Sequence, residues 1–152
     1  MAPIDPVITL ACIAALFASL VWIAHLRKKV ASAQARMDFL LHSDPLTGLP
    51  NHMLARDRLE RLIAYASRGG SKVAVTAVDV DDFKSVNDSA GHLVGDALIQ
   101  DVAGRLRNAV RDSDTVSRQN ADEFLVLLGD IRDVDATTRV AGKLQDALAH
   151  PF

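Results

Sequence analysis

Apolar side chains are spread unevenly along the chain, and the first 43 residues differ in pattern from the rest. Residues 7–24 carry no charged side chain, and the run up to residue 26 reaches the roughly 20 residues that a helix needs to cross a bilayer. Basic residues 27–29 follow at once, whereas only Asp5 is charged before the run. Basic flanks stay on the cytoplasmic side, so residues 1–26 are predicted to hold one membrane-spanning helix.

Two other interpretations of the apolar run stay open. A cleaved signal peptide would begin with basic residues and have a shorter apolar core, and residues 1–6 contain no basic side chain. A buried helix of a soluble protein is the plainest alternative, but it does not account for the basic residues 27–29. The anchor interpretation predicts a single-pass protein of the inner (cytoplasmic) membrane whose remaining residues face the cytoplasm.

Residues 27–43 are predicted to form a helical connector. Val30, Ala33, Met37 and Leu40 recur every three or four residues, which gives a helix with one narrow apolar seam. Such a seam can pair two chains as a short coiled coil. It can equally pack on its own domain, and the segment is too short to decide between the two.

Residues 44–152 show alternating helical and strand patterns. Residues 44–51 are dense in turn formers, and a β-branched run over residues 73–80 predicts a buried strand. The other predicted elements are a helix over residues 54–66 that stops at Gly69-Gly70, a polar loop over 88–95, a helix over 96–110, a hairpin of strands 115–119 and 123–128, and a helix over 135–149. Strands that alternate with helices predict an α/β fold, one sheet backed by helices.

Composition excludes several classes of protein. Hydrophobic residues make up 49% of the chain and charged residues 24%, which favours an ordered fold. The net charge of −2 provides no basic stripe for nucleic acid. Cys12 is the sole cysteine, so no disulfide can form within the chain, and the five histidines lack the spacing of a zinc site.

Four acidic side chains stand at predicted strand ends. Asp79 and Asp81 are two residues apart and would point to one face at the tip of the buried strand, while Asp122 and Glu123 follow the hairpin turn. Carboxylates that meet from two strand ends suit Mg²⁺ on the phosphates of a nucleotide. Aspartates at strand ends are also ordinary turn residues and helix caps, and periodicity alone does not separate the two interpretations.

The segment after the buried strand is rich in polar side chains. Lys84 beside the carboxylates suits phosphate, and Asn87 with Asp96 suits the edge of a purine base. His92 lies between them. Asp96 would also serve as the N-cap of the helix that is predicted to begin there.

Three stretches closely resemble the GGDEF family, the diguanylate cyclases, in their order and spacing. They are Asp-Pro-Leu-Thr-Gly-Leu-Pro-Asn at 44–51, Asp-Val-Asp-Asp-Phe-Lys-Ser-Val-Asn-Asp at 79–88, and Gly-His-Leu-Val-Gly-Asp at 91–96. The resemblance implies a nucleotidyl-cyclase-like fold over residues 44–152. It also implies that two GTP molecules are joined into cyclic di-GMP, that each half of a homodimer holds one GTP, and that Mg²⁺ or Mn²⁺ assists.

The resemblance also implies roles for individual residues. It makes Asp79, the Val80 carbonyl and Asp122 the metal ligands, with Asp122 also the proton acceptor. Catalytic roles fall to Asp122, Glu123 and Lys84, of which Lys84 steadies the transferring phosphates. The implied substrate-binding positions are Asn87, His92, Asp96, Asn120 and Ala121, with Asn87 and Asp96 at the guanine.

Arg111-Asp112-Ser113-Asp114 is similar to the family's Arg-x-x-Asp inhibitory site, at the usual distance before the signature. An arginine can clamp a phosphate or stack on guanine, so Arg111 and Asp114 suit bound cyclic di-GMP. A surface ion pair at the end of a helix is the alternative interpretation.

The chain departs from the family pattern in two places. Asn120-Ala121 replaces Gly-Gly, and alanine adopts the left-handed backbone of a tight turn only at a cost of about 1–2 kcal/mol. Family domains also continue with further strands, so a fragment with an open sheet edge is expected, and the sequence near its end is similar to GGDEF–EAL composite proteins. Three functions follow as hypotheses, namely a weak cyclase, a binding module for GTP or cyclic di-GMP without turnover, and a nonfunctional remnant.

Overall fold

The computed structural model describes residues 6–151, although the side chains of residues 6–9, 11–15, 18, 35 and 134 are not described. Two units can be distinguished, residues 1–39 and residues 40–152. The elements in chain order are α1 (Pro6–His42), α2 (His52–Gly69), β1 (Lys72–Asp79), α3 (Phe83–Ala90), α4 (His92–Ala109), β2 (Thr115–Arg118), β3 (Glu123–Ile131) and α5 (Val134–Ala149).

Helix α1 runs without a break through the apolar run and the predicted connector. Its described apolar side chains are exposed, among them Leu16, Phe17 and Trp22. Within the described part of the chain, no helix is both long enough and apolar enough to span a membrane. The structure therefore does not support the membrane helix predicted over residues 7–26, and many side chains of that segment lie outside the described residues.

A turn of residues 43–51 joins the end of α1 to the domain that follows. Asp44 N–H donates to the Leu49 carbonyl at 2.8 Å, and Ser43 pairs with Pro50 in an isolated β-bridge. Asn51 then caps α2, because its Oδ1 accepts from the backbone N–H groups of Met53 and Leu54 at 3.0 and 3.1 Å. The turn predicted at residues 44–51 is therefore present, and its last residue is the N-cap of α2.

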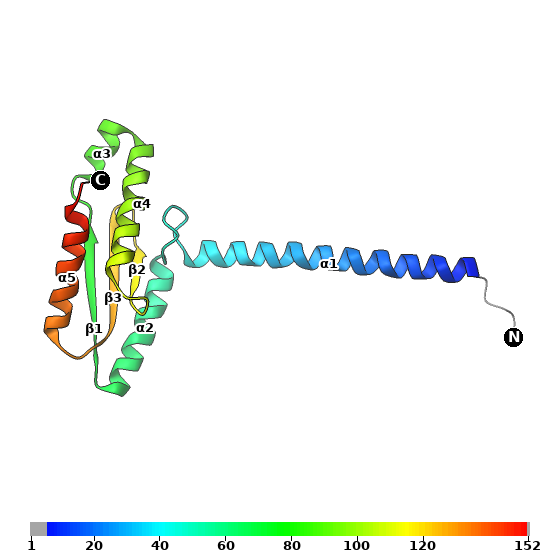
Figure 1. The fold of residues 1–152 in the computed structure, drawn as a ribbon, viewed down its shortest axis with the longest axis horizontal. Coiled ribbons are helices and arrows are strands. Elements are labelled where there is room, and N and C mark those ends of the chain that lie inside the picture. The colour runs from blue at the N-terminus through cyan, green and yellow to red at the C-terminus, as the bar shows by residue number, and fades with distance from the viewer. Residues whose placement is uncertain (1–5, 152) are drawn as a thin grey trace. The chain divides into compact units, whose positions relative to one another are not determined.

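The sheet has three antiparallel strands in the order β1-β3-β2. Side chains alternate along the central strand β3. Phe124, Val126 and Leu128 belong to the main core, whereas a Cβ at Gly129, on the opposite face, would meet Leu62 of α2. Helices α4 and α5 therefore cover one face and α2 the other, and Figure 1 shows the strands lying between α5 and α2.

The main core lies between the sheet and helices α4 and α5. Ile99 and Leu106 of α4 are fully buried, and Leu144 of α5 is nearly so. Each such side chain contributes about 1.5–3 kcal/mol by leaving water. The predicted α/β fold with a sheet backed by helices is confirmed, and this packing fixes the strand ends where the candidate site lies.

The segment between β1 and α4 differs from the prediction. A loop was predicted over residues 88–95, but residues 83–90 form α3, and α4 begins at His92 rather than at Asp96. Gly91, with φ of 89°, ends α3 and begins α4, so Asp96 lies inside a helix and is not its N-cap. Phe83 is buried at the start of α3 and anchors this short polar helix, a tertiary contact that local polarity does not reveal.

Two strand boundaries also differ. β1 ends at Asp79, so Asp81 lies in the turn that follows. The prediction that Asp79 and Asp81 share one strand face is therefore wrong. β3 extends to Ile131, because Lys72 at the start of β1 pairs with that residue. Among the described residues β1 is paired on one side only, with β3.

Candidate functional site

The predicted metal-site residues come together where β1 ends and β3 begins. Asp79 and Glu123 are direct partners across the two antiparallel strands. One residue further on, Val80 N–H donates to the Asp122 carbonyl at 3.3 Å. Four positions from segments more than 40 residues apart are thus held side by side by the β1–β3 ladder.

The carboxylates in this group repel one another. Asp79 and Glu123 are both exposed, and like charges directly opposite in an antiparallel pair are destabilising. Among the described residues, no three His, Cys, Asp or Glu side chains are placed to hold a metal ion. Two carboxylates and a backbone carbonyl nevertheless fit Mg²⁺, which usually binds one or two carboxylates and takes its other ligands from substrate phosphates and water.

Helix α3 directly follows this acidic group. It begins after Asp82, whose φ of 55° turns the chain sharply from β1 into the helix. Lys84 therefore lies in the first turn of α3 and is exposed. A shallow groove of about 480 Å³ is lined by Asp82, Lys84, Ser85, Asp88 and Ser89. Lys84 thus follows the acidic end of β1 by only a few residues in the sequence.

The predicted substrate-binding residues Asn87, His92 and Asp96 lie on α3 and the start of α4. Asn87 accepts a hydrogen bond from Gly91 N–H at its carbonyl, at 3.0 Å. Its side chain is packed tightly against α4, since a Cβ at Gly95 would lie 2.0 Å from Asn87 Oδ1. His92 and Asp96 are exposed in the first turns of α4. The α3–α4 packing therefore sets the position of Asn87 relative to Asp96.

The altered signature turn joins β2 to β3. The Asn120 side-chain amide donates to Glu123 Oε2 across the turn. Among the described residues, only Asp82 and Asp130 have positive φ outside glycine. The predicted left-handed strain at Ala121 is therefore wrong, because this four-residue turn is closed without that conformation.

Arg118 holds the turn in place from the end of β2, and sequence reasoning missed it. Its guanidinium donates to the carbonyls of Asn120 and Ala121, at 3.0 and 2.6 Å. A third bond, 3.0 Å long, joins it to Asp44, and both side chains of this ion pair are largely buried. The one available signal was a basic residue directly before the turn.

The pKa of the Asp44 carboxyl is lower than its ordinary value. Burial of the carboxyl raises the pKa, but the opposing effects are larger. Thr47 donates to Asp44 Oδ1 from both its N–H and its hydroxyl, at 2.9 and 2.7 Å. Together with the Arg118 guanidinium, these hydrogen bonds hold the pKa of Asp44 below its ordinary value.

Arg111 and Asp114 lie at the other end of α4 from His92 and Asp96. Helix α4 has 18 residues, so its ends are about 27 Å apart. Arg111 N–H donates to Asp114 Oδ2 at 3.1 Å, and Asp114 N–H donates to the Arg111 carbonyl at 3.0 Å. The predicted inhibitory pair thus forms its own tight turn, separate from the acidic group.

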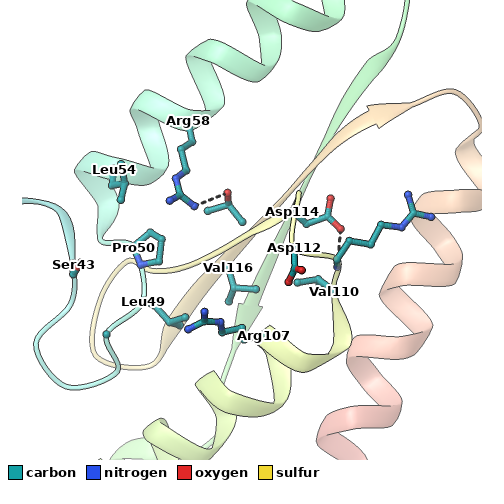
Figure 2. Close-up of a pocket in the computed structure, with 13 residues that line it drawn as sticks. Ser43, Leu49, Pro50, Leu54, Arg58, Arg107, Val110, Asp112, Asp114 and Val116 are labelled. Carbon is teal, nitrogen blue, oxygen red and sulfur yellow. Dashed lines mark hydrogen bonds between the residues drawn. The ribbon is translucent and has the colours of Figure 1, made fainter.

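A pocket of about 370 Å³ adjoins this pair, and Figure 2 shows it between α2, the end of α4 and the start of β2. Arg58 lines it from α2 and donates to the Thr115 hydroxyl at 3.1 Å. Arg107 lines it from α4, together with Arg111 and Asp114. Three arginines, from two helices and the loop after α4, line this end of the domain beside Asp112 and Asp114 and can contact an anionic ligand.

Comparison with known proteins agrees with this geometry. The family model described as "Diguanylate cyclase, GGDEF domain" matches residues 41–152. The bifunctional diguanylate cyclase/cyclic di-GMP phosphodiesterase MucR of Pseudomonas aeruginosa is 42% identical over 127 residues, which are 84% of this chain and 18% of MucR. The cyclic di-GMP phosphodiesterase PdeR of Escherichia coli is 36% identical over 120 residues, 79% of this chain and 18% of PdeR.

Solved structures show the same relationship. The GGDEF domain of TpbB from Pseudomonas aeruginosa superimposes with a TM-score of 0.71 and 36% sequence identity, covering 73% of this chain and 64% of that domain's chain. The present chain spans only 18% of the length of MucR and of PdeR. The motifs at 44–51, 79–88 and 91–96, the fold and the family match agree, and the chain belongs to the GGDEF family.

Proposed function

We propose that residues 44–152 form a diguanylate cyclase-like module of cyclic di-GMP signalling that binds GTP with Mg²⁺ or Mn²⁺ and has weak or no turnover. The reaction of this class joins two GTP molecules into cyclic di-GMP and pyrophosphate. The observation that carries the proposal is the pairing of Asp79 with Glu123 beside Val80 and Asp122. Similarity to proteins named as diguanylate cyclases supports it.

In this proposal the acidic group holds the metal ion, with Asp79, the Val80 carbonyl and Asp122 as ligands. Such an ion would neutralise charge on the nucleotide phosphates. Lys84, a few residues away on α3, would bind a phosphate oxygen, and Asn87 with Asp96 would contact the guanine edge. Each chain would hold one GTP, so the reaction requires two copies.

Weak turnover follows from the substituted turn. Since Asn120 and Ala121 cause no left-handed strain, their effect falls on the ligand rather than on the fold. Side-chain atoms now project where two glycines would leave bare backbone, and displacement of reacting atoms by about 1 Å can cost a hundredfold in rate. GTP binding is therefore expected to survive better than the reaction.

Two experiments test the proposal. The full chain is incubated with GTP and Mg²⁺ and the products are identified by chromatography and mass spectrometry. Calorimetric titration then measures the binding of a non-hydrolysable GTP analogue. We expect binding of the analogue and little or no cyclic di-GMP. Asp122→Asn should weaken metal-dependent binding, whereas Asp57→Asn, an exposed charge change on α2, should not. Failure of the analogue to bind at all would sink the cyclase-like assignment.

A second candidate is a module that binds cyclic di-GMP without turnover. The intact Arg111-Asp114 turn and the neighbouring arginines favour it. Titration of cyclic di-GMP should then give binding that Arg111→Ala removes. If neither nucleotide binds and limited proteolysis degrades residues 44–152 quickly, the chain is a nonfunctional remnant.

We further propose attachment to the inner membrane by residues 7–26, with the GGDEF domain in the cytoplasm. The support is in the sequence, an uncharged run followed by basic residues 27–29. Fractionation of cells that express the full chain should leave it in the membrane pellet after alkaline extraction. Recovery in the supernatant would contradict this localisation.

A further inference from the structure

Asn120 makes a contact within the signature turn that two glycines could not make. Its side-chain amide donates to Oε2 of Glu123, three residues later. The turn backbone is fixed beneath it, because Gln119 N–H donates to the Glu123 carbonyl at 2.8 Å and Arg118 binds the Asn120 carbonyl. The turn backbone therefore keeps the Asn120 amide next to the Glu123 carboxylate.

This contact ties the Glu123 carboxylate to the turn on one side of its strand. β3 is the central strand, with β2 on one side and β1 on the other. Asn120 belongs to the turn that connects β2 to β3, whereas Asp79 lies at the end of β1. A carboxylate bound to Asn120 thus has one oxygen occupied by the turn on the β2 side of β3.

The absence of a three-carboxylate group among the described residues is consistent with this arrangement. Asp79 and Glu123 are direct partners across the ladder, yet no metal-binding cluster forms there in the described part of the chain. Mutual repulsion of the two carboxylates also favours the bond to Asn120. Any divalent ion that recruits Glu123 must first break that hydrogen bond or share its oxygen.

We propose that Asn120 is a positioning residue that withholds Glu123 from the metal ion of a bound nucleotide. The proposal rests on the proposed function, because it assigns a role within the same site. Removal of the amide releases the carboxylate toward Asp79 and Asp122. Binding of a metal-loaded nucleotide is thereby strengthened more than binding of the metal-free nucleotide.

Asn120→Ala tests this, since it removes the amide and keeps a Cβ in the turn. Calorimetry on the full chain compares a non-hydrolysable GTP analogue loaded with Mn²⁺ and the same analogue in EDTA. We expect the variant to bind the Mn²⁺ complex about fivefold more tightly than the unaltered chain, the factor corresponding to one net hydrogen bond, and the affinity in EDTA to change less. Gln119→Ala is the matched control, because it removes an amide from the same turn that contacts Ser117 instead.

A second pair of variants ties the effect to Glu123. In a Glu123→Gln background, Asn120→Ala should no longer change the affinity for the Mn²⁺ complex. The proposal is overturned if Asn120→Ala leaves that affinity unchanged or lowers it, or if its effect persists without the Glu123 carboxylate. If no variant binds the analogue under either condition, the proposed function fails and takes this inference with it.

Discussion

Arg118 joins parts of the domain that are far apart in the sequence. It bridges Asp44, 74 residues earlier, to the carbonyls of the signature turn. Carboxylates at strand ends could be predicted from the sequence, because strand periodicity places them locally. The role of Arg118 could not be predicted, because Asp44 comes near it only when the turn at 43–51 packs against the end of β2. A backbone hydrogen bond marks this packing, since Arg118 N–H donates to the Pro50 carbonyl at 2.9 Å.

Loss of this guanidinium should be costly. Arg118→Ala would leave the largely buried Asp44 carboxylate without its ion pair, and we expect the free energy of unfolding to fall by about 3 kcal/mol. Arg61→Ala is the control, because its ion pair with Asp57 is exposed and should contribute less than about 1 kcal/mol. Urea unfolding of both variants measures the difference, and equal losses would refute the structural role of Arg118.

The lowered pKa of Asp44 makes the free energy of unfolding depend on pH in the acidic range. A carboxyl whose pKa is lower in the folded than in the unfolded state stabilises the fold above its ordinary value of 3.8, and this stability is lost as pH falls through the folded pKa. Below pH 4, the free energy of unfolding should therefore drop more steeply for the unaltered chain than for Asp44→Asn. Parallel curves from urea titrations at pH 3 to 6 would contradict this.

At the scale of elements, prediction succeeded where one face of an element is buried. The strand around Val78, the hairpin and the last helix have regular apolar spacing, and their positions agree to within three residues. Helix α3 was missed because its residues are mostly polar and its limits depend on two backbone conformations, Asp82 with φ of 55° and Gly91 with φ of 89°. Tertiary packing determines these two backbone conformations, and they cannot be predicted from the periodicity of apolar residues.

The junction of α3 and α4 offers a test of how packing controls the candidate nucleotide site. Gly95→Ala would place a Cβ against Asn87, so overpacking should cost about 1–3 kcal/mol and displace the Asn87 side chain. Weaker binding of a GTP analogue should accompany the lower stability. Gly104→Ala is the matched control on α4, where no atom lies within 4 Å, and it should stabilise by about 0.5–1 kcal/mol.

At the scale of the whole molecule, the proposed reaction needs two chains. In the proposed function, the acidic group, Lys84 and the α3–α4 junction of one domain hold one nucleotide, so two nucleotides would meet across a pair of chains. We therefore expect the rate of any cyclic di-GMP formation to rise with the square of the chain concentration while most chains are unpaired. A dilution series of the full chain in detergent, assayed by mass spectrometry, measures this order.

An excess of Asp122→Asn chains sharpens the same test. These chains retain the surfaces that pair but would lack one metal ligand, so mixed pairs would carry one impaired half. Product formation by a fixed amount of unaltered chain should then fall as the variant is added. A rate that is linear in chain concentration and indifferent to the variant would mean that a single chain acts alone, and the two-chain arrangement would have to be abandoned even if GTP binding is confirmed.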